Sequence, residues 1–390
     1  MRFRPLLLAA VLLVGGVAPS AAGAWELGGF ASLGGGQATW PADNFLYLAR
    51  DEQPWSANFR LLAEAGGGLW HLSANLLEAM GNKPPLAPAA GEQSPREVER
   101  SSGLTWEQHD SAASRAALTA DVLALQHRSG PVDVTAGRQP ISLATTFCFS
   151  PNDFFAPFAA QNFFRTYRPG VDGLRIDWRL APLSQAALLG VLAYEVDGES
   201  ANGWKRAPQW SRSAVLAMFN HEWRGCGWNL LGGTVADRTL AGGGLQGELF
   251  DWLGVRAEGH YALAERRGAG EGGRFTVGVE HRQGDDFDWR LEYHYNGYLG
   301  RDIIRGDRHY TALGMGYQFT PLLSGNLLAL ADLHDGSRLY SVNLLYSLSD
   351  ESELTLTSTL PQGLRPAGSD PGSEFGRQPR QLLLEYRITF

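Results

Sequence analysis

The chain has 390 residues, of which 44% are hydrophobic, 48 are glycine and only two are cysteine. Its 41 acidic residues outnumber its 33 lysines and arginines, so the formal net charge is −8. A nucleic-acid-binding surface is usually basic, and this charge balance therefore argues against a nucleic-acid partner. The chain also lacks the Cys-x-x-Cys-His run that attaches a c-type haem. We expect no cofactor and no bound metal.

The first 24 residues have the composition of a secretory signal peptide. A basic Met-Arg-Phe-Arg start precedes an apolar run over residues 6–17, and small residues end at Ala24. That run is too short for a transmembrane helix, which needs about 20 apolar residues. We predict that residues 1–24 are removed and that residues 25–390 form one mature domain.

The last ten residues predict an amphipathic strand. Successive side chains of a strand point to opposite faces, so alternation gives one apolar face and one polar face. A strand of this kind ending in Phe390 resembles the signal by which outer-membrane barrels are recognised. We therefore expect the barrel-assembly machinery and outer-membrane lipid as partners. The apolar face holds Leu382, Leu384, Tyr386, Ile388 and Phe390, and the opposite face holds Leu383, Glu385, Arg387 and Thr389.

The same alternation recurs along the chain and predicts an all-β fold, a transmembrane antiparallel β-barrel. Charges of both signs on the polar face are typical of a water-filled lumen. About 18 segments alternate, an even number as in bacterial single-chain barrels; 16 stays open because residues 227–250 and 320–348 are ambiguous. Short and long connections alternate, which places the short ones in the periplasm. The predicted strands are 26–39, 54–64, 69–78, 113–127, 132–144, 170–180, 185–196, 210–223, 227–237, 244–250, 253–265, 273–282, 287–298, 309–319, 323–333, 338–348, 352–360 and 380–390.

A barrel of this size leaves an aqueous channel, and the loop after the fifth strand is the best candidate to narrow it. Residues 146–169 include seven phenylalanines, which is too apolar for a loop in water. One interpretation is that this loop packs against the barrel wall or a neighbouring loop. A second is a constriction that presents Arg165 and Arg168 to a solute, and a third is direct capture of a hydrophobic ligand. The aromatic candidates are Phe154, Phe155 and Phe158.

Charged residues on the predicted inward faces are nearly balanced in sign. This balance favours ion-pair ladders along the wall, and an arginine excess around the sixth strand, with Arg175 and Arg179, suggests anionic solutes. The inward residues are Arg60, Arg115, Arg175, Arg179, Arg256, Arg274, Arg282, Arg290 and Arg387, with Glu64, Asp121, Asp177, Glu258, Glu280, Glu292 and Glu385.

Three segments carry a resemblance to a known group. They are Gly137-Arg138-Gln139-Pro140-Ile141, the run from Ser150 to Phe158, and Arg168-Pro169-Gly170-Val171-Asp172-Gly173-Leu174-Arg175. This pattern resembles porin-like outer-membrane proteins, nearest the alginate-export family. The resemblance implies an 18-stranded barrel whose arginine-lined pore passes an anionic polysaccharide. It also implies that Arg138, Arg168, Asp172 and Arg175 lie at or near the constriction, although strict alternation places Arg138 on the apolar face unless a bulge intervenes.

The sequence offers no enzyme signature, because it contains neither Gly-x-Ser-x-Gly nor His-Glu-x-x-His. We predict an outer-membrane channel of a Gram-negative cell, for passive diffusion or export of small polar solutes, with anionic solutes or oligosaccharides among them. The alternatives are a structural or adhesive barrel and a hydrophobic-ligand transporter with a loop-closed lumen. The predicted constriction comprises Arg138, Arg165, Arg168, Asp172, Arg175 and Arg179.

The two cysteines are predicted not to pair. Cys148 follows a strand that ends outside the membrane, whereas Cys226 falls in a periplasmic turn. A disulfide needs Cα atoms within about 7 Å, which this topology does not allow.

Overall fold

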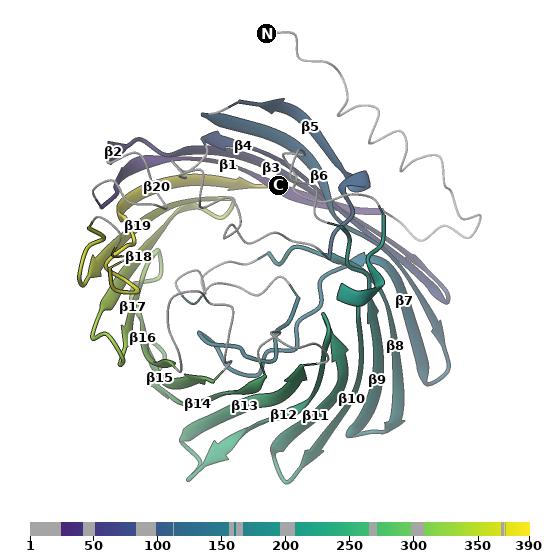
Figure 1. The fold of residues 1–390 in the computed structure, drawn as a ribbon. Coiled ribbons are helices and arrows are strands. Elements are labelled where there is room, and N and C mark those ends of the chain that lie inside the picture. Colours follow the sequence, from purple (N-terminus) through teal and green to yellow (C-terminus); the bar gives the residue numbers. More distant parts are fainter. Residues whose placement is uncertain are drawn as a thin grey trace.

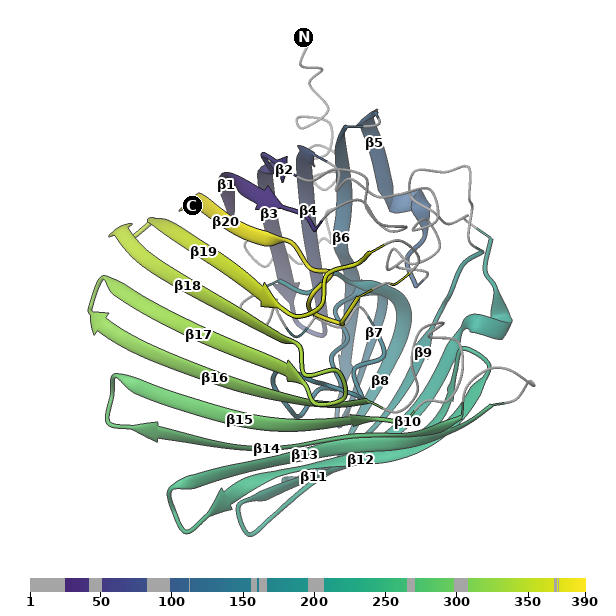
Figure 2. The ribbon, with the colours of Figure 1, turned by 60° about the vertical axis from the view of Figure 1, so that its left-hand side comes forward.

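The chain forms one antiparallel sheet that closes into a barrel, seen along its axis in Figure 1 and from the side in Figure 2. The last strand pairs with the first over ten residue positions, from Phe30 opposite Thr389 to Thr39 opposite Arg380. The signal peptide predicted at residues 1–24 lies outside the described residues. The computed structural model describes residues 25–41, 51–82, 99–111, 113–155, 160, 167–195, 207–264, 271–297, 308–367, 370 and 372–390.

Eighteen strands make up the wall of the barrel, which confirms the predicted fold and strand number. Each one corresponds to a predicted segment, including those in the two ambiguous regions. They are β1 (Trp25–Thr39), β3 (Trp55–Gly67), β4 (Trp70–Asn82), β6 (Ser114–Ser129), β7 (Val132–Gln139), β8 (Val171–Ala181), β9 (Ser184–Val191), β10 (Ala214–Trp223), β11 (Cys226–Val235), β12 (Arg238–Leu249), β13 (Leu253–Ala264), β14 (Gly272–Gln283), β15 (Phe287–Asn296), β16 (Arg308–Thr320), β17 (Leu323–Asp332), β18 (Arg338–Ser349), β19 (Ser352–Gln362) and β20 (Arg380–Thr389).

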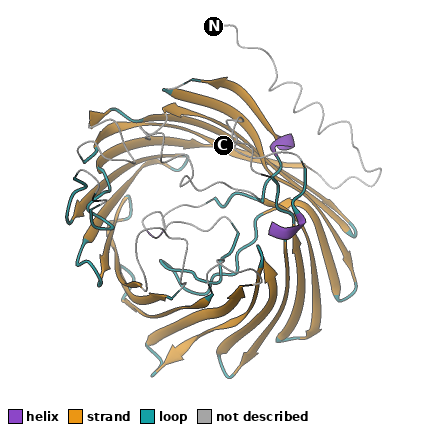
Figure 3. Cartoon of the chain, viewed as in Figure 1, coloured by secondary structure: helices purple, strands orange, loops and turns teal. Residues whose placement is uncertain are grey.

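Two further short strands belong to the connections between wall strands. β2 (Asp51–Glu52) pairs with the end of β1, and β5 (Thr105–Asp110) pairs with β6 beyond the point where β7 stops. Among the described residues, the 3-10 helices η2 (Ser102–Leu104) and η4 (Trp210–Arg212) are single turns, drawn purple in Figure 3.

No helix among the described residues is long and apolar enough to cross a membrane.

Several strand ends differ from the predicted ones for local reasons. β7 stops at Gln139 rather than at residue 144, because Pro140 has no N–H to donate to a ladder. β10 begins at Ala214 because the preceding turn is helical. β12 begins at Arg238, six residues earlier than predicted, because the glycines at 242–244 leave no side chains to show the alternation.

The two ends of the barrel carry connections of different length. At the end that holds Trp25 and Phe390 the strands are joined by tight hairpins, such as 68–69 and 130–131, in which Gly68 and Gly130 have φ of +61° and +60°. At the other end most connections are long, including those between β4 and β6 and between β7 and β8. We call these the terminal end and the long-loop end.

The outer face of the wall is apolar. Side chains such as Leu230, Leu263 and Leu384 are 62%, 55% and 46% exposed, and the closed sheet leaves them facing outward. Closure pairs the backbone groups of every wall strand on both sides, which is what a hydrocarbon environment demands.

Ion pairs line the inner face, as the balanced inward charges predict. Arg256 contacts Glu280 at 2.9 Å, and Arg387 contacts both Glu353 at 3.1 Å and Glu385 at 2.8 Å. Each such pair contributes little to stability where water reaches it. Two inward carboxylates are different, because they hold a loop instead of a cation.

Candidate constriction and solute cavities

The described residues of the connection between β7 and β8, which spans 140–170, lie inside the barrel instead of extending from it. In Figure 1 its blue-teal segments lie inside the ring of strands. Residues 140–155, 160 and 167–170 of this connection are described. We call it the inner loop. It packs against the barrel wall, as the first predicted interpretation has it, and the constriction stays a prediction.

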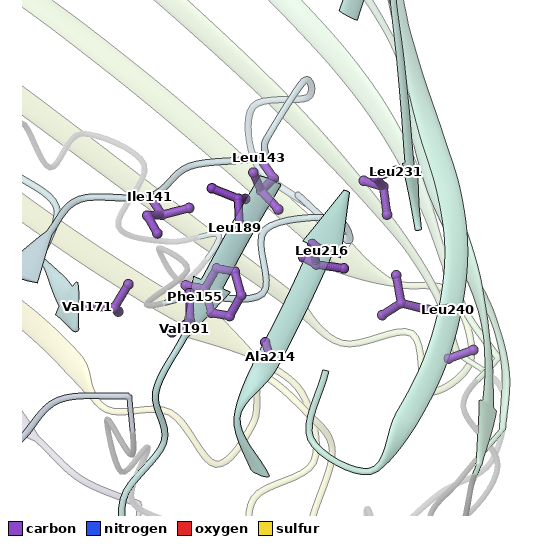
Figure 4. Close-up of a cluster of buried hydrophobic side chains, with 11 residues drawn as sticks. Ile141, Leu143, Phe155, Val171, Leu189, Val191, Ala214, Leu216, Leu231 and Leu240 are labelled. Atoms are coloured by element: carbon purple, nitrogen blue, oxygen red, sulfur yellow. The ribbon is translucent and has the colours of Figure 1, made fainter. Parts of the chain in front are cut away.

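Apolar contacts hold the residues on both sides of the turn of the inner loop against the wall. Ile141, Leu143 and Phe155 are 1%, 5% and 1% exposed, and they pack on inward-facing apolar side chains of β8 to β13 (Figure 4). Burying a side chain of this size stabilises by about 1.5–3 kcal/mol, so the three together form a firm anchor. The wall side of the cluster comprises Val171, Leu189, Val191, Ala214, Leu216, Leu231, Leu240 and Ala262.

This inward apolar patch departs from the expected polar lumen. On β9, Leu189 faces the inner loop while Leu188, 47% exposed, faces outward. The strand is therefore apolar on both faces, as strands covered on both sides are. The signal in the sequence is the unbroken apolar run over residues 186–194.

Two inward carboxylates hold the middle of the inner loop through its backbone. Glu258 on β13 accepts hydrogen bonds from the N–H groups of Thr145, Thr146 and Asn152, the last two at 3.2 Å. Glu292 on β15 accepts from three consecutive N–H groups, those of residues 147, 148 and 149, at 2.6, 2.9 and 3.1 Å. The two residues are 3% and 2% exposed.

Aromatic side chains of the inner loop lie against charged and ring-bearing wall residues. The guanidinium carbons of Arg256 and Arg290 lie 4.3 and 4.5 Å from the centre of the Phe147 ring. Cations within about 6 Å of a ring centre are attracted to its face. Phe149 stacks on His294, with 5.0 Å between ring centres and 12° between planes.

The far side of the turn is tied by polar contacts. The Oδ1 atom of Asn152 accepts from Nδ1 of His260 at 3.0 Å, and Phe154 packs edge-on to the same ring. Asp153 accepts from the backbone N–H of Leu143 and forms an ion pair with Arg168. Burial raises the pKa of Asp153, and the charge of Arg168 opposes that rise. The described part of the inner loop is therefore held by contacts within itself as well as by contacts with the wall.

A cavity of about 670 Å³ lies on the long-loop side of the inner loop. We call it the outer cavity. Its floor includes Phe149 and Phe154, and its walls include Arg212 from η4, Arg238 from β12 and Arg274 from β14. Asp153 and Asp237 also line it. Three guanidinium groups from three separate elements thus face one chamber beside two aromatic rings.

A second cavity, of about 1010 Å³, opens toward the terminal end. We call it the inner cavity. Arg256 and Arg290, which contact Phe147, line it together with acidic wall residues such as Glu280 and Asp288. The inner loop therefore lies between two chambers, and residues of both signs line each one.

The predicted constriction residues fall in three places. Phe154, Phe155 and Arg168 belong to the inner loop, where Phe155 is part of its apolar anchor. Arg165 and Phe158 lie outside the described residues. Arg175 and Arg179 are on the inner face of β8, where Arg175 contacts Asp177 at 2.6 Å, and Arg179 donates to the carbonyl of Gly130 in a terminal-end hairpin.

Arg138 and Asp172, at the end of β7 and the start of β8, pair with each other beside the inner loop, and their place at the constriction stays a prediction. The Arg138 side chain is 0% exposed and donates to Asp172, to the carbonyl of Ala120 and to the carbonyl of Ser101. It fills the space where β7 ends between β6 and β8. Because β7 ends early, it leaves a gap between β6 and β8, and the segment at residues 99–101 covers that gap.

Several site residues were not recognised as such from the sequence. Glu258 and Glu292 were expected as members of ion-pair ladders, because the alternation shows only that they face inward. Arg212 and Arg238 lie at the long-loop end, next to connections where alternation gives no signal. Both cysteines are free, as predicted, with Cys148 buried in the inner loop.

No protein-family model matches the sequence, and no curated protein matches it either. Solved structures do match the fold. OccAB4 of Acinetobacter baumannii has a TM-score of 0.59 at 10% identity, covering 96% of this chain and 100% of that chain. This chain has the barrel fold of a porin. A BenF-like porin from Pseudomonas fluorescens Pf-5 has a TM-score of 0.60 at 10% identity, with 94% and 98% covered. OpdK, an outer membrane protein of Pseudomonas aeruginosa, has 0.55 at 15% identity, with 94% and 99% covered.

Among the described ranges, no group of three or more His, Cys, Asp or Glu side chains is placed to hold a metal ion.

Proposed function

We propose that this protein is a passive channel in the outer membrane of a Gram-negative cell, selective for small anionic solutes. A closed 18-stranded barrel with an apolar outer face and a charged inner face spans a bilayer and encloses water. The outer cavity, at about 670 Å³, has the size of a small-molecule site rather than of a protein-conducting pore. The tight hairpins of the terminal end then lie in the periplasm.

The observation that carries the anion preference is the arrangement of Arg212, Arg238 and Arg274 around the outer cavity. A guanidinium group presents a planar fork of donors that matches a carboxylate or phosphate. The cavity also holds Asp153, which Arg168 neutralises, and Asp237. Three arginines therefore line the cavity beside two aspartates, and this excess of arginine favours an entering anion.

The two ring faces of the outer cavity favour a planar or aromatic anion. Phe149 and Phe154 lie on its floor beside the arginines. A structure of OpdK from Pseudomonas aeruginosa was solved with vanillate, an aromatic carboxylate, and matches this chain with a TM-score of 0.54 at 14% identity. An aromatic carboxylate is thus a suitable first probe for this cavity. Export of a long polysaccharide is less well supported, because the inner loop lies across the lumen.

The test is single-channel recording in a planar bilayer across a salt gradient. We expect stable open steps with a reversal potential that shows anion preference, and benzoate or vanillate should reduce the chloride current in a concentration-dependent way. The double variant Arg238→Ala/Arg274→Ala should lose most of both effects. Arg282→Ala, on the wall of the inner cavity, is the matched control and should retain the carboxylate block. Cation preference in the parent protein would overturn the proposal, and absence of any current would mean that the inner loop seals the lumen.

A further inference from the structure

The inner loop places six backbone N–H groups on only two carboxylates. Residues 145, 146 and 152 donate to Glu258, and residues 147–149 donate to Glu292. In the described part of the chain neither carboxylate forms an ion pair, although both face the lumen among arginines that do. The wall therefore provides two negative charges for which the loop backbone supplies the hydrogen-bond partners.

We propose that Glu258 and Glu292 are the positioning residues of the constriction, and that they set the bore of the channel by fixing residues 145–152 against the wall. The effect on bore rests on the channel function proposed above. The effect on the loop does not, because it follows from the hydrogen bonds alone. The Phe147 and Phe149 side chains also contact β15, through Arg290 and His294, but it is Glu292 that accepts the backbone N–H groups of residues 147–149.

The two carboxylates and the apolar anchor act on different parts of the inner loop. Ile141, Leu143 and Phe155 are buried against the wall on either side of the turn. Loss of a carboxylate releases residues 145–152, which can then move into the lumen while the flanking anchor residues stay on the wall. A buried N–H group that loses its acceptor is costly, and this cost makes the fixed position depend on the carboxylates.

Glutamine is the decisive substitution because it keeps the shape of the side chain and changes its hydrogen bonding. One of its two terminal atoms is an NH₂ group, which cannot accept from a backbone N–H. Glu292→Gln therefore leaves at least one of three amides facing a donor. Glu292→Asp keeps the acceptors but shortens the side chain, and it should recover part of the parent behaviour.

Cys148 is a reporter already present in the inner loop. It is 4% exposed, and its own N–H group donates to Glu292 at 2.9 Å. In a Cys226→Ser background it is the only thiol, so alkylation by a water-soluble maleimide reports release of the loop. The rate is read first in Glu258→Gln, because the charge of Glu292 itself raises the pKa of Cys148. We expect Glu258→Gln and Glu292→Gln to raise the alkylation rate about tenfold or more, the factor for about 1.4 kcal/mol.

The control is Glu353→Gln, which removes an inward carboxylate on β19 that pairs with Arg387 and does not contact the described residues of the inner loop. It should leave Cys148 as slow as in the parent. We call Glu258→Gln and Glu292→Gln the clamp variants. In bilayers they should show larger and noisier open steps, whereas Glu353→Gln should change only ion preference. Equal Cys148 rates in the parent and in Glu258→Gln/Glu292→Gln would overturn the proposal.

Hydrogen exchange on the unmodified protein tests the same proposal if the variants do not fold. The amides of residues 145–149 and 152 should be protected to a degree similar to wall amides, and rapid exchange there would contradict the clamp. If Cys148 is released in the clamp variants but neither they nor the parent conduct, the clamp stands and the channel function fails. If the parent conducts and Cys148 reacts in the variants at the parent rate, the channel function stands and the proposed role of Glu258 and Glu292 fails.

Discussion

Arg138 holds Asp172 in a two-point ion pair, with its Nε and Nη2 atoms 2.6 and 3.0 Å from the two carboxylate oxygens. Asp172 also accepts from the backbone N–H of Ser101 at 2.7 Å. These contacts join the ends of β7 and β8 to the segment that enters η2. The pair therefore joins the wall strands where β7 stops early.

Arg138→Ala should destabilise the barrel without changing ion preference. Removing one partner of a buried pair leaves an uncompensated charge and costs about 3–5 kcal/mol. Chemical denaturation of the refolded protein in detergent, followed by the loss of heat-modifiable gel mobility, measures this cost. Asp172→Asn should cost less, since its amide oxygen still accepts from Ser101. An unchanged unfolding midpoint for Arg138→Ala would show that the pair is dispensable.

Cys148 should react slowly with alkylating reagents across the ordinary pH range. Burial, with the nearby charge of Glu292, raises the pKa of Cys148 to about 12. The thiolate is the reactive form, so at pH 8 only roughly one thiol in ten thousand is ionised. The rate should therefore keep rising about tenfold per pH unit through pH 10 instead of levelling off near 9. The urea-unfolded protein is the control, and a plateau near pH 9 in the folded protein would contradict the burial.

Leu356 and Thr357 test the assignment of faces, because they are neighbours on β19 that point in opposite directions. Leu356 is 36% exposed on the outer face, and Thr357 accepts from the Asn343 side chain inside. Leu356→Arg should destabilise the barrel by about 2–4 kcal/mol, the cost of an arginine facing mid-bilayer lipid. Thr357→Arg should cost clearly less. Refolding into vesicles across a urea series provides the measurement, and equal costs would mean that the faces are misassigned.

Arg175→Ala should reduce anion preference by exposing a negative charge. Arg175 pairs with Asp177 two residues along β8, at 2.6 Å, and its side chain is 30% exposed to the lumen. Without it, the Asp177 carboxylate keeps only the Gln185 amide, at 2.8 Å. The reversal potential across a salt gradient should shift toward that of a cation channel. Arg175→Ala/Asp177→Ala should restore the parent value, because it removes both charges; a shift that persists in the double variant would point to a different cause.

Much of the fold was predictable because alternation is a local property. The faces of Leu384 and Glu385, or of Leu356 and Thr357, follow from their positions in a strand, and neighbouring strands repeat the pattern. The strand ends were less accurate where Pro140 or the glycines at 242–244 interrupt that pattern. The free state of the cysteines also followed, since strand order alone places them at different ends.

The sequence by itself determined the barrel, a strand number of about 18 with 16 still open, the apolar outer face and the presence of an aromatic loop after the fifth predicted strand. Only the tertiary structure decided what that loop contacts. Thr145 and Glu258 are 113 residues apart, and Phe147 and Glu292 are 145 apart. Their meeting depends on where closure of the sheet places β13 and β15 relative to β7. No local pattern encodes that distance, because a glutamate facing the lumen looks the same in sequence whether its partner is an arginine, water or the backbone of a folded-in loop.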